Sequence, residues 1–146
     1  YLERLKSMKL NALASPLLSE LRQNPDDDQL LLQLGFLYAE QKDYAEAKKY
    51  FEKAVKVAPD VSATHNSLGN VDFVLENYAQ AEISYLKAID LDPMDPYVWV
   101  NLARTYIKKG DNVKASAAFS SAVKLDPTVS TRHRGLALEL MNPMKP

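Results

Sequence analysis

Apolar side chains recur three and four positions apart along most of the chain, which is the spacing of helices that bury one face. Leu31, Leu34 and Tyr38 follow this spacing, and Ala47 and Phe51 belong to a second series a few positions later. Polar residues fill the positions between the apolar ones and the short gaps between one series and the next. The pattern therefore predicts pairs of short amphipathic helices joined by turns.

The same apolar, small and proline positions return with a fixed period, which is the step from Pro25 to Pro59. The aligned residues of four such repeat columns are Pro25, Pro59, Pro93 and Pro127; Ala47, Ala81 and Ala115; Phe51, Tyr85 and Phe119; and Ala54, Ala88 and Ala122. A fixed period of this length indicates a helical hairpin that repeats and buries its apolar face against its neighbours. We therefore expect an all-α array of three full repeats, over residues 28–61, 62–95 and 96–129.

A helix-capping residue type marks the turn inside each repeat, at Asp43, Asn77 and Asp111. Side-chain oxygens of these residues can accept a hydrogen bond from the unpaired amides at the start of the following helix. The repeated prolines end the second helix of each repeat, because proline disfavours helical geometry in the residue before it. These signals predict one helix before each turn and one after it.

The segments on either side of the repeats are also predicted to be helical. Residues 1–27 are interpreted as a helical extension or a degenerate earlier repeat, with one helix over residues 1–10 and another from Ser15 and Pro16 to Gln23. Residues 130–141 are predicted to form one capping helix, and residues 142–146 a frayed tail. The whole chain, residues 1–146, is expected to be a single domain.

The repeated motif resembles a known family over residues 28–129. Leu31-x-x-Leu-Gly-x-x-Tyr38, followed by Ala47, Phe51, Ala54 and Pro59, is similar to the tetratricopeptide repeat, and Trp99-x-x-Leu-Ala-x-x-Tyr106 adds its signature tryptophan. The resemblance implies an α-helical superhelix, or solenoid, in which the first helices of successive repeats line a concave groove. It also implies a non-enzymatic scaffold or adaptor module that receives a peptide or a helix of a partner protein.

Composition narrows the class of partner. The chain has 47% hydrophobic and 25% charged residues and no uninterrupted apolar run long enough to span a membrane, so membrane insertion is not expected. A net charge of −1 argues against a nucleic-acid-binding surface. The absence of cysteine excludes a disulfide framework and a thiolate nucleophile, but it is compatible with cytoplasm and periplasm alike and leaves the compartment unknown.

One stretch, "HNSLGNVD" at residues 65–72, gathers side chains that could do chemistry. His65, however, shares its repeat column with Leu31, Trp99 and His133, which indicates a packing position between helices. No nucleophile with a matching base, no phosphate-binding glycine loop and no metal-ligand spacing occurs, so neither catalysis nor a cofactor or metal is expected. Asp72 stands where the neighbouring repeats have tyrosine, and a carboxylate there needs a partner that the sequence does not identify.

The register of the repeats also predicts which side chains face the groove. They are Gln29, Leu32, Gln33 and Phe36 in the first repeat, Asn66, Ser67, Asn70 and Phe73 in the second, Tyr97, Asn101, Arg104 and Lys108 in the third, and Arg134 at the end. Amides can donate to and accept from an extended backbone, and the aromatic rings offer apolar contact. The basic residues would favour an acidic or C-terminal carboxylate end of the partner. The alternative is that these are ordinary solvated residues.

Heat-shock co-chaperones of this family hold a terminal carboxylate with lysine and asparagine, which Leu32 and Phe36 replace here, so that role is not expected. Two other hypotheses remain. The chain could be the regulatory or substrate-presenting arm of a larger enzyme, since it opens on Tyr1 and a degenerate segment. It could also self-assemble into a homo-oligomer, because residues 62–95 hold six acids and one lysine, whereas residues 96–129 hold five bases and two acids.

Overall fold

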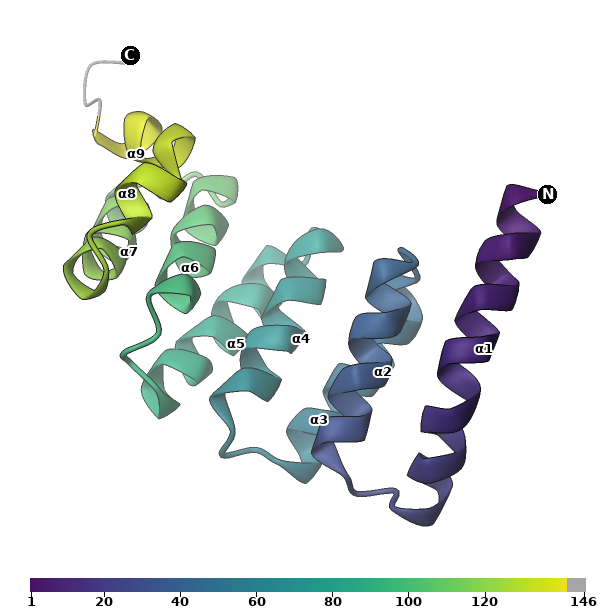
Figure 1. The fold of residues 1–146 in the computed structure, drawn as a ribbon. Coiled ribbons are helices and arrows are strands. Elements are labelled where there is room, and N and C mark those ends of the chain that lie inside the picture. Colours follow the sequence, from purple (N-terminus) through teal and green to yellow (C-terminus); the bar gives the residue numbers. More distant parts are fainter. Residues whose placement is uncertain (142–146) are drawn as a thin grey trace.

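The structure is a computed structural model that describes residues 1–141, and within them all regular structure is α-helical. The helices are α1 (Leu2–Gln23), α2 (Asp28–Glu40), α3 (Tyr44–Val57), α4 (Ser62–Val74), α5 (Tyr78–Leu91), α6 (Pro96–Lys108), α7 (Asn112–Leu125), α8 (Val129–Arg132) and α9 (Arg134–Met141). From α2 to α7 they pair into three hairpins, and these stack side by side from α1 at one end to α9 at the other (Figure 1). The predicted superhelical solenoid is confirmed.

The repeat columns are the contacts that hold each hairpin together. Ala47 is fully buried between helices, and Gly35 lies so close to the Phe51 ring that an added Cβ would approach it to 2.4 Å. The second repeat uses the same arrangement, because a Cβ on Gly69 would lie 2.7 Å from the Tyr85 ring. Small residues on one helix therefore make room for an aromatic ring on its partner, and the sequence repeats them together.

The turns within the repeats share a left-handed residue. Lys42, Glu76 and Gly110 have positive φ angles of 62°, 63° and 81° and occupy the same column of the three repeats. Only glycine adopts this conformation without a steric cost, so the first two repeats carry strain that the third avoids. Asp43 and Asp111, the next residues in two of these turns, accept hydrogen bonds from the amides of Glu46 and Lys114 as predicted.

The N-terminal segment forms one helix instead of the two expected. Helix α1 continues through Pro16, although a proline lacks the N–H that would bond to the carbonyl four residues earlier. Leu10 and Ala14 before the proline and Leu17 and Leu21 after it lie on one face and pack against the first repeat. This continuous apolar stripe stabilises the helix across the missing hydrogen bond.

The C-terminal segment is divided where a single capping helix was expected. Helix α8 ends at Arg132, and the next residue, His133, has φ and ψ of −115° and 46°, which interrupt the helix before α9 begins. Val129 and Ala137 anchor the two pieces in the core that they share with the second and third repeats. The predicted tail, residues 142–146, lies outside the described residues. None of the helices in residues 1–141 has the length and apolar character needed to cross a membrane.

Candidate binding groove

The first helices of the repeats carry most of the predicted groove residues on an accessible face. Eight are exposed and three are half-buried: Gln29, Gln33, Phe36, Asn70, Tyr97, Arg104, Lys108 and Arg134, and then Asn66, Phe73 and Asn101. They lie on α2, α4 and α6, with Arg134 at the start of α9. These side chains are therefore available to a partner.

Two of the predicted groove residues are not available. Leu32 is 7% exposed and belongs to the core cluster that joins the first repeat to Val71 of the second. Ser67 is 4% exposed, and its hydroxyl donates to the carbonyl of Ala63 at 2.8 Å, inside its own helix. Both were expected to face the groove, but both side chains are buried: Leu32 packs against the neighbouring repeat, and Ser67 bonds within its own helix.

Three asparagines and a buried tyrosine form a hydrogen-bonded network at the centre of the groove. The Tyr85 hydroxyl donates to Oδ1 of Asn70 at 2.8 Å, and Nδ2 of Asn101 donates to the same oxygen at 3.2 Å. Nδ2 of Asn101 also lies 3.3 Å from Oδ1 of Asn66, to which it donates. The network joins α4, α5 and α6 and therefore links two repeats.

This network fixes which way the amides point. Because Oδ1 of Asn70 accepts two hydrogen bonds, its Nδ2 is left as a donor, and Oδ1 of Asn101 is left as an acceptor, with no further partner among the described residues. Burial raises the pKa of the Tyr85 hydroxyl, against the smaller opposite effect of Arg104, and so keeps it protonated as a donor. Asn70 thus presents an oriented donor to the groove, and Asn101 presents an oriented acceptor.

Two hollows lie on this face. The central hollow measures about 390 Å³ and is lined by Asn70, Phe73, Val74, Tyr85, Asn101 and Arg104. The second, of about 440 Å³, lies between α1 and α2 and is mostly apolar; Leu13, Pro16, Leu17, Gln33, Phe36, Leu37 and Glu40 line it. The groove therefore changes from apolar near α1 to polar and basic near α6.

The histidine of the "HNSLGNVD" stretch is a packing residue. His65 is 9% exposed, and its Nε2 donates to the carbonyl of Pro59 at 2.7 Å. Trp99, its counterpart in the next repeat, donates through Nε1 to the carbonyl of Pro93 at 3.0 Å. The His65 imidazole therefore makes the hydrogen bond that the tryptophan indole of the motif makes in the next repeat. Its role is structural.

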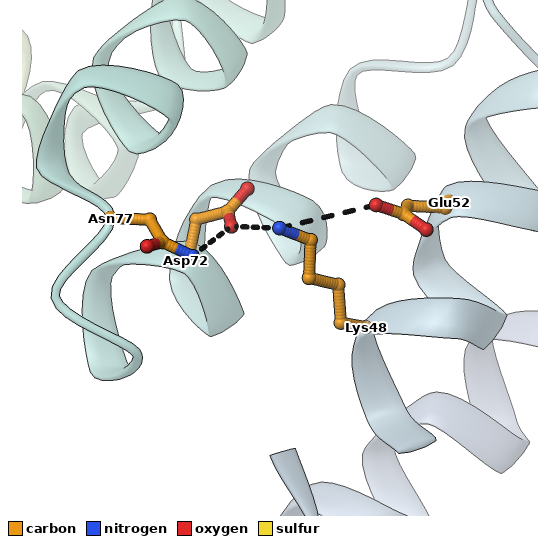
Figure 2. A network of polar contacts seen from close by, with 4 residues as sticks. All are labelled: Lys48, Glu52, Asp72 and Asn77. Atoms are coloured by element: carbon orange, nitrogen blue, oxygen red, sulfur yellow. Dashed lines mark hydrogen bonds and ion pairs between the residues drawn. The ribbon is translucent and has the colours of Figure 1, made fainter. Parts of the chain in front are cut away.

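Asp72 has the partner that the sequence left open (Figure 2). Its carboxylate is buried and forms an ion pair of 2.7 Å with Nζ of Lys48 on α3, and it accepts a hydrogen bond of 3.2 Å from the Asn77 amide. Nζ of Lys48 also lies 3.9 Å from Glu52. Asn77 consequently does not cap α5 with its side chain, contrary to expectation.

Lys48 and Tyr85 are the functional partners that the sequence analysis missed. A signal for Lys48 exists, because the same two columns bring Glu82 into contact with Tyr106 in the following pair of repeats. Burial, and then the nearby Glu82 carboxylate, raise the pKa of Tyr106. Both pairs have the same separation in the sequence, so a complementary charge at that spacing would have identified the partner of Asp72.

In residues 1–141, no group of three or more potential ligands is arranged to hold a metal ion.

Comparison with known proteins agrees with this geometry. Two family models described as tetratricopeptide repeat match residues 26–94 and 84–115. The chain is 33% identical over 96 residues to cilia- and flagella-associated protein 70 of Homo sapiens, which covers 66% of this chain and 8% of that protein. The chain thus spans less than a tenth of this curated relative.

Solved structures with a similar fold cover most of the chain. A crystal structure of MamA protein matches with a TM-score of 0.77 and 18% identity, over 95% of this chain and 81% of that one. The first repeat domain of Spaghetti (RPAP3), bound to the HSP90 peptide SRMEEVD, matches with a TM-score of 0.71 and 18% identity, over 78% and 93% of the two chains. At this identity the likeness establishes the fold.

Proposed function

We propose that this chain, which belongs to the tetratricopeptide repeat family, binds an extended segment of another protein along its concave groove. The fold is typically a non-catalytic scaffold for protein interaction, and neighbours of this structure bind peptides. The observation that carries the proposal is the asparagine network beside the central hollow. The chain acts by holding a partner and performs no chemical step.

The network suits a peptide backbone because it offers the two groups that a peptide unit needs. Nδ2 of Asn70 can donate to a backbone carbonyl, and Oδ1 of Asn101 can accept from a backbone N–H. Hydrogen bonds to Tyr85 and Asn66 hold both amides in place before the partner arrives, so little conformational entropy is lost on binding. Phe73 then offers an apolar contact for a neighbouring side chain of the peptide.

The hollow near α1 provides a second point of contact. Phe36 is 49% exposed there and lies beside Leu13 and Pro16 of α1. A bulky apolar side chain would displace water from this surface, which stabilises binding by about 25 cal/mol per Å² of apolar area removed from water. We therefore expect a peptide with an apolar anchor at one end and an acidic segment toward Arg104 at the other.

A randomised array of short peptides tests this function. The purified chain should retain a subset of these peptides, and the Asn70→Ala/Asn101→Ala variant should lose that subset. The matched control is Gln80→Ala/Asn112→Ala, which removes two exposed amides of α5 and α7 outside the groove. Circular dichroism verifies that both variants fold. Equal retention by the folded groove variant and the control would refute the assignment.

Self-association is the alternative favoured by the charge distribution. The acidic second repeat of one copy could contact the basic third repeat of another, because their excess charges have opposite sign. Sedimentation velocity at low salt should then show dimers or larger species that dissociate as salt is added. A monomer at every protein concentration and salt concentration would exclude this alternative.

A further inference from the structure

Four cations lie on the helices that form the C-terminal end of the groove: Arg104 and Lys108 on α6, Arg132 on α8 and Arg134 on α9. We call them the basic end. Within residues 1–141, none of the four forms an ion pair. Asp126 lies near enough to act on Arg132, but its carboxylate accepts hydrogen bonds from Thr128 instead. The positive charge of the basic end is thus left largely uncompensated.

Neutral groups hold the two central arginines. Nη2 of Arg104 lies 3.0 Å from Nδ1 of His133, and Nη1 of Arg132 donates to the hydroxyl of Tyr97. A guanidinium carries five N–H donors, so each arginine keeps most of its donors for another acceptor. Arg104 also lines the central hollow, which places these donors where a bound peptide would pass.

His133 can accept this hydrogen bond only when it is neutral. The Arg104 guanidinium has no lone pair to offer, so Nδ1 of His133 must be unprotonated in the contact. Burial lowers the pKa of His133, and the positive charges of Arg104 on α6 and Arg132 on α8 lower it further. Among the described residues, no carboxylate contributes to the pKa shift of His133, and Arg134, the next residue along the chain, is also a cation.

We propose that an acidic side chain of the bound peptide enters between Arg104 and Arg132, and that His133 takes up one proton as it binds. The proposal rests on the peptide-binding function above. The carboxylate accepts hydrogen bonds from Arg104, which releases Nδ1 of His133, and its negative charge offsets the two guanidinium charges around the ring. The protonated imidazole then becomes a third donor to the same carboxylate.

The consequence is a binding affinity that depends on pH. The pKa of His133 is lowered in the free protein, whereas the bound carboxylate raises it. Between these two values, binding consumes a proton, so the association constant increases by up to about tenfold for each pH unit that the solution is lowered. Glutamate side chains of the peptide stay ionised down to about pH 5, so they do not reverse the trend.

Hexaglutamate with blocked ends is the probe, and hexaglutamine with the same ends is the neutral comparison. Fluorescence anisotropy from about pH 8 to about pH 6 should show tighter binding of hexaglutamate at low pH and none of hexaglutamine. NMR titration of the His133 ring should show its pKa rising when the peptide is bound. A hexaglutamate with a free C-terminal carboxylate distinguishes side-chain from terminal recognition.

Three variants distinguish proton uptake by His133 from charge attraction by the arginines. His133→Gln keeps an acceptor for Arg104 and should bind hexaglutamate with no pH dependence, whereas Arg104→Met should weaken binding at least about tenfold. Lys56→Gln removes one exposed cation of α3, in the first repeat, and should change neither the affinity for hexaglutamate nor its pH dependence. No binding of hexaglutamate, or the same pH profile in His133→Gln, would overturn the inference. The proposed peptide-binding function is tested separately by the peptide array. If Asn70→Ala/Asn101→Ala abolishes binding to the array, that function is supported even when the inference about His133 is overturned.

Discussion

Removal of Lys48 should destabilise the fold far more than its partial exposure suggests. In Lys48→Met, the Asp72 carboxylate keeps the Asn77 amide but loses the ammonium at 2.7 Å while it remains buried at 2% exposure. Breaking a buried ion pair from one side costs about 3–5 kcal/mol in the free energy of unfolding. Because the Lys48 side chain is 27% exposed, we reduce the expected loss to about 2–3 kcal/mol.

The reverse change should cost less. In Asp72→Asn, the buried side chain is neutral and still accepts from Asn77, while Lys48 can turn toward Glu52 and water. We expect a loss of about 1 kcal/mol for this variant. The double variant should lose about 2 kcal/mol less than the two single losses added together, because no charge remains buried without a partner.

Urea unfolding followed by circular dichroism measures all three variants. Lys49→Met is the matched control, because Lys49 is the next residue, is exposed and, among the described residues, forms its ion pair only with Glu46 of its own helix, at 3.0 Å. Its free energy of unfolding should stay close to that of the unchanged protein, because an exposed ion pair contributes little to stability. If Lys48→Met unfolds like Lys49→Met, or if the effects of Lys48→Met and Asp72→Asn simply add, the ion pair does not join the first two repeats.

Four further predictions test the rest of the structure by the same unfolding measurement. Gly69→Ala should lose about 1–3 kcal/mol because its Cβ meets the Tyr85 ring, whereas Gly135→Ala, with nothing within 4 Å, should not be destabilised. His65→Phe should lose about 1 kcal/mol by leaving the Pro59 carbonyl unpaired, and His65→Trp should retain more of the stability because its indole can donate as Trp99 does. Lys42→Gly should increase the free energy of unfolding by about 0.5 kcal/mol, because glycine adopts the positive φ of this position without strain. A decrease of the same size would show that the angle is unstrained. The pKa of His133 is lowered on folding, so its contribution to stability should be complete above about pH 6.5 and should decrease as pH falls toward its folded pKa, and His133→Gln should remove this decrease.

The fold could be predicted from the sequence because the same packing contacts occur in each repeat. Each repeat column holds residues that touch in the same way, as Gly35 with Phe51 and Gly69 with Tyr85 show. One sequence therefore supplies several copies of the same contact, and chance variation in one copy does not hide it. Helix α1 has no second copy in the sequence, which is why the break predicted between residues 10 and 15 was wrong.

The groove was only partly predictable, because its surface depends on contacts between repeats. Register alone assigns a face to each residue, but Leu32 is covered by the neighbouring repeat and Ser67 bonds within its own helix. Orientation of the asparagine amides depends on Tyr85, which lies on the second helix of the hairpin and was considered only as a core residue. Both features require the relative position of three helices, which the period does not specify.

The second repeat shows how departures from the pattern compensate one another. Asp72 replaces the tyrosine of the other repeats, and a buried carboxylate so placed requires a cation and a donor. Lys48 supplies the cation, and Asn77 supplies the donor at a position where both other repeats have aspartate. An aspartate at position 77 would have brought a second carboxylate toward the first. The side-chain amide of Asn77 therefore does not cap α5 but satisfies Asp72, and these two departures form, with Lys48, one polar link between the first and second repeats.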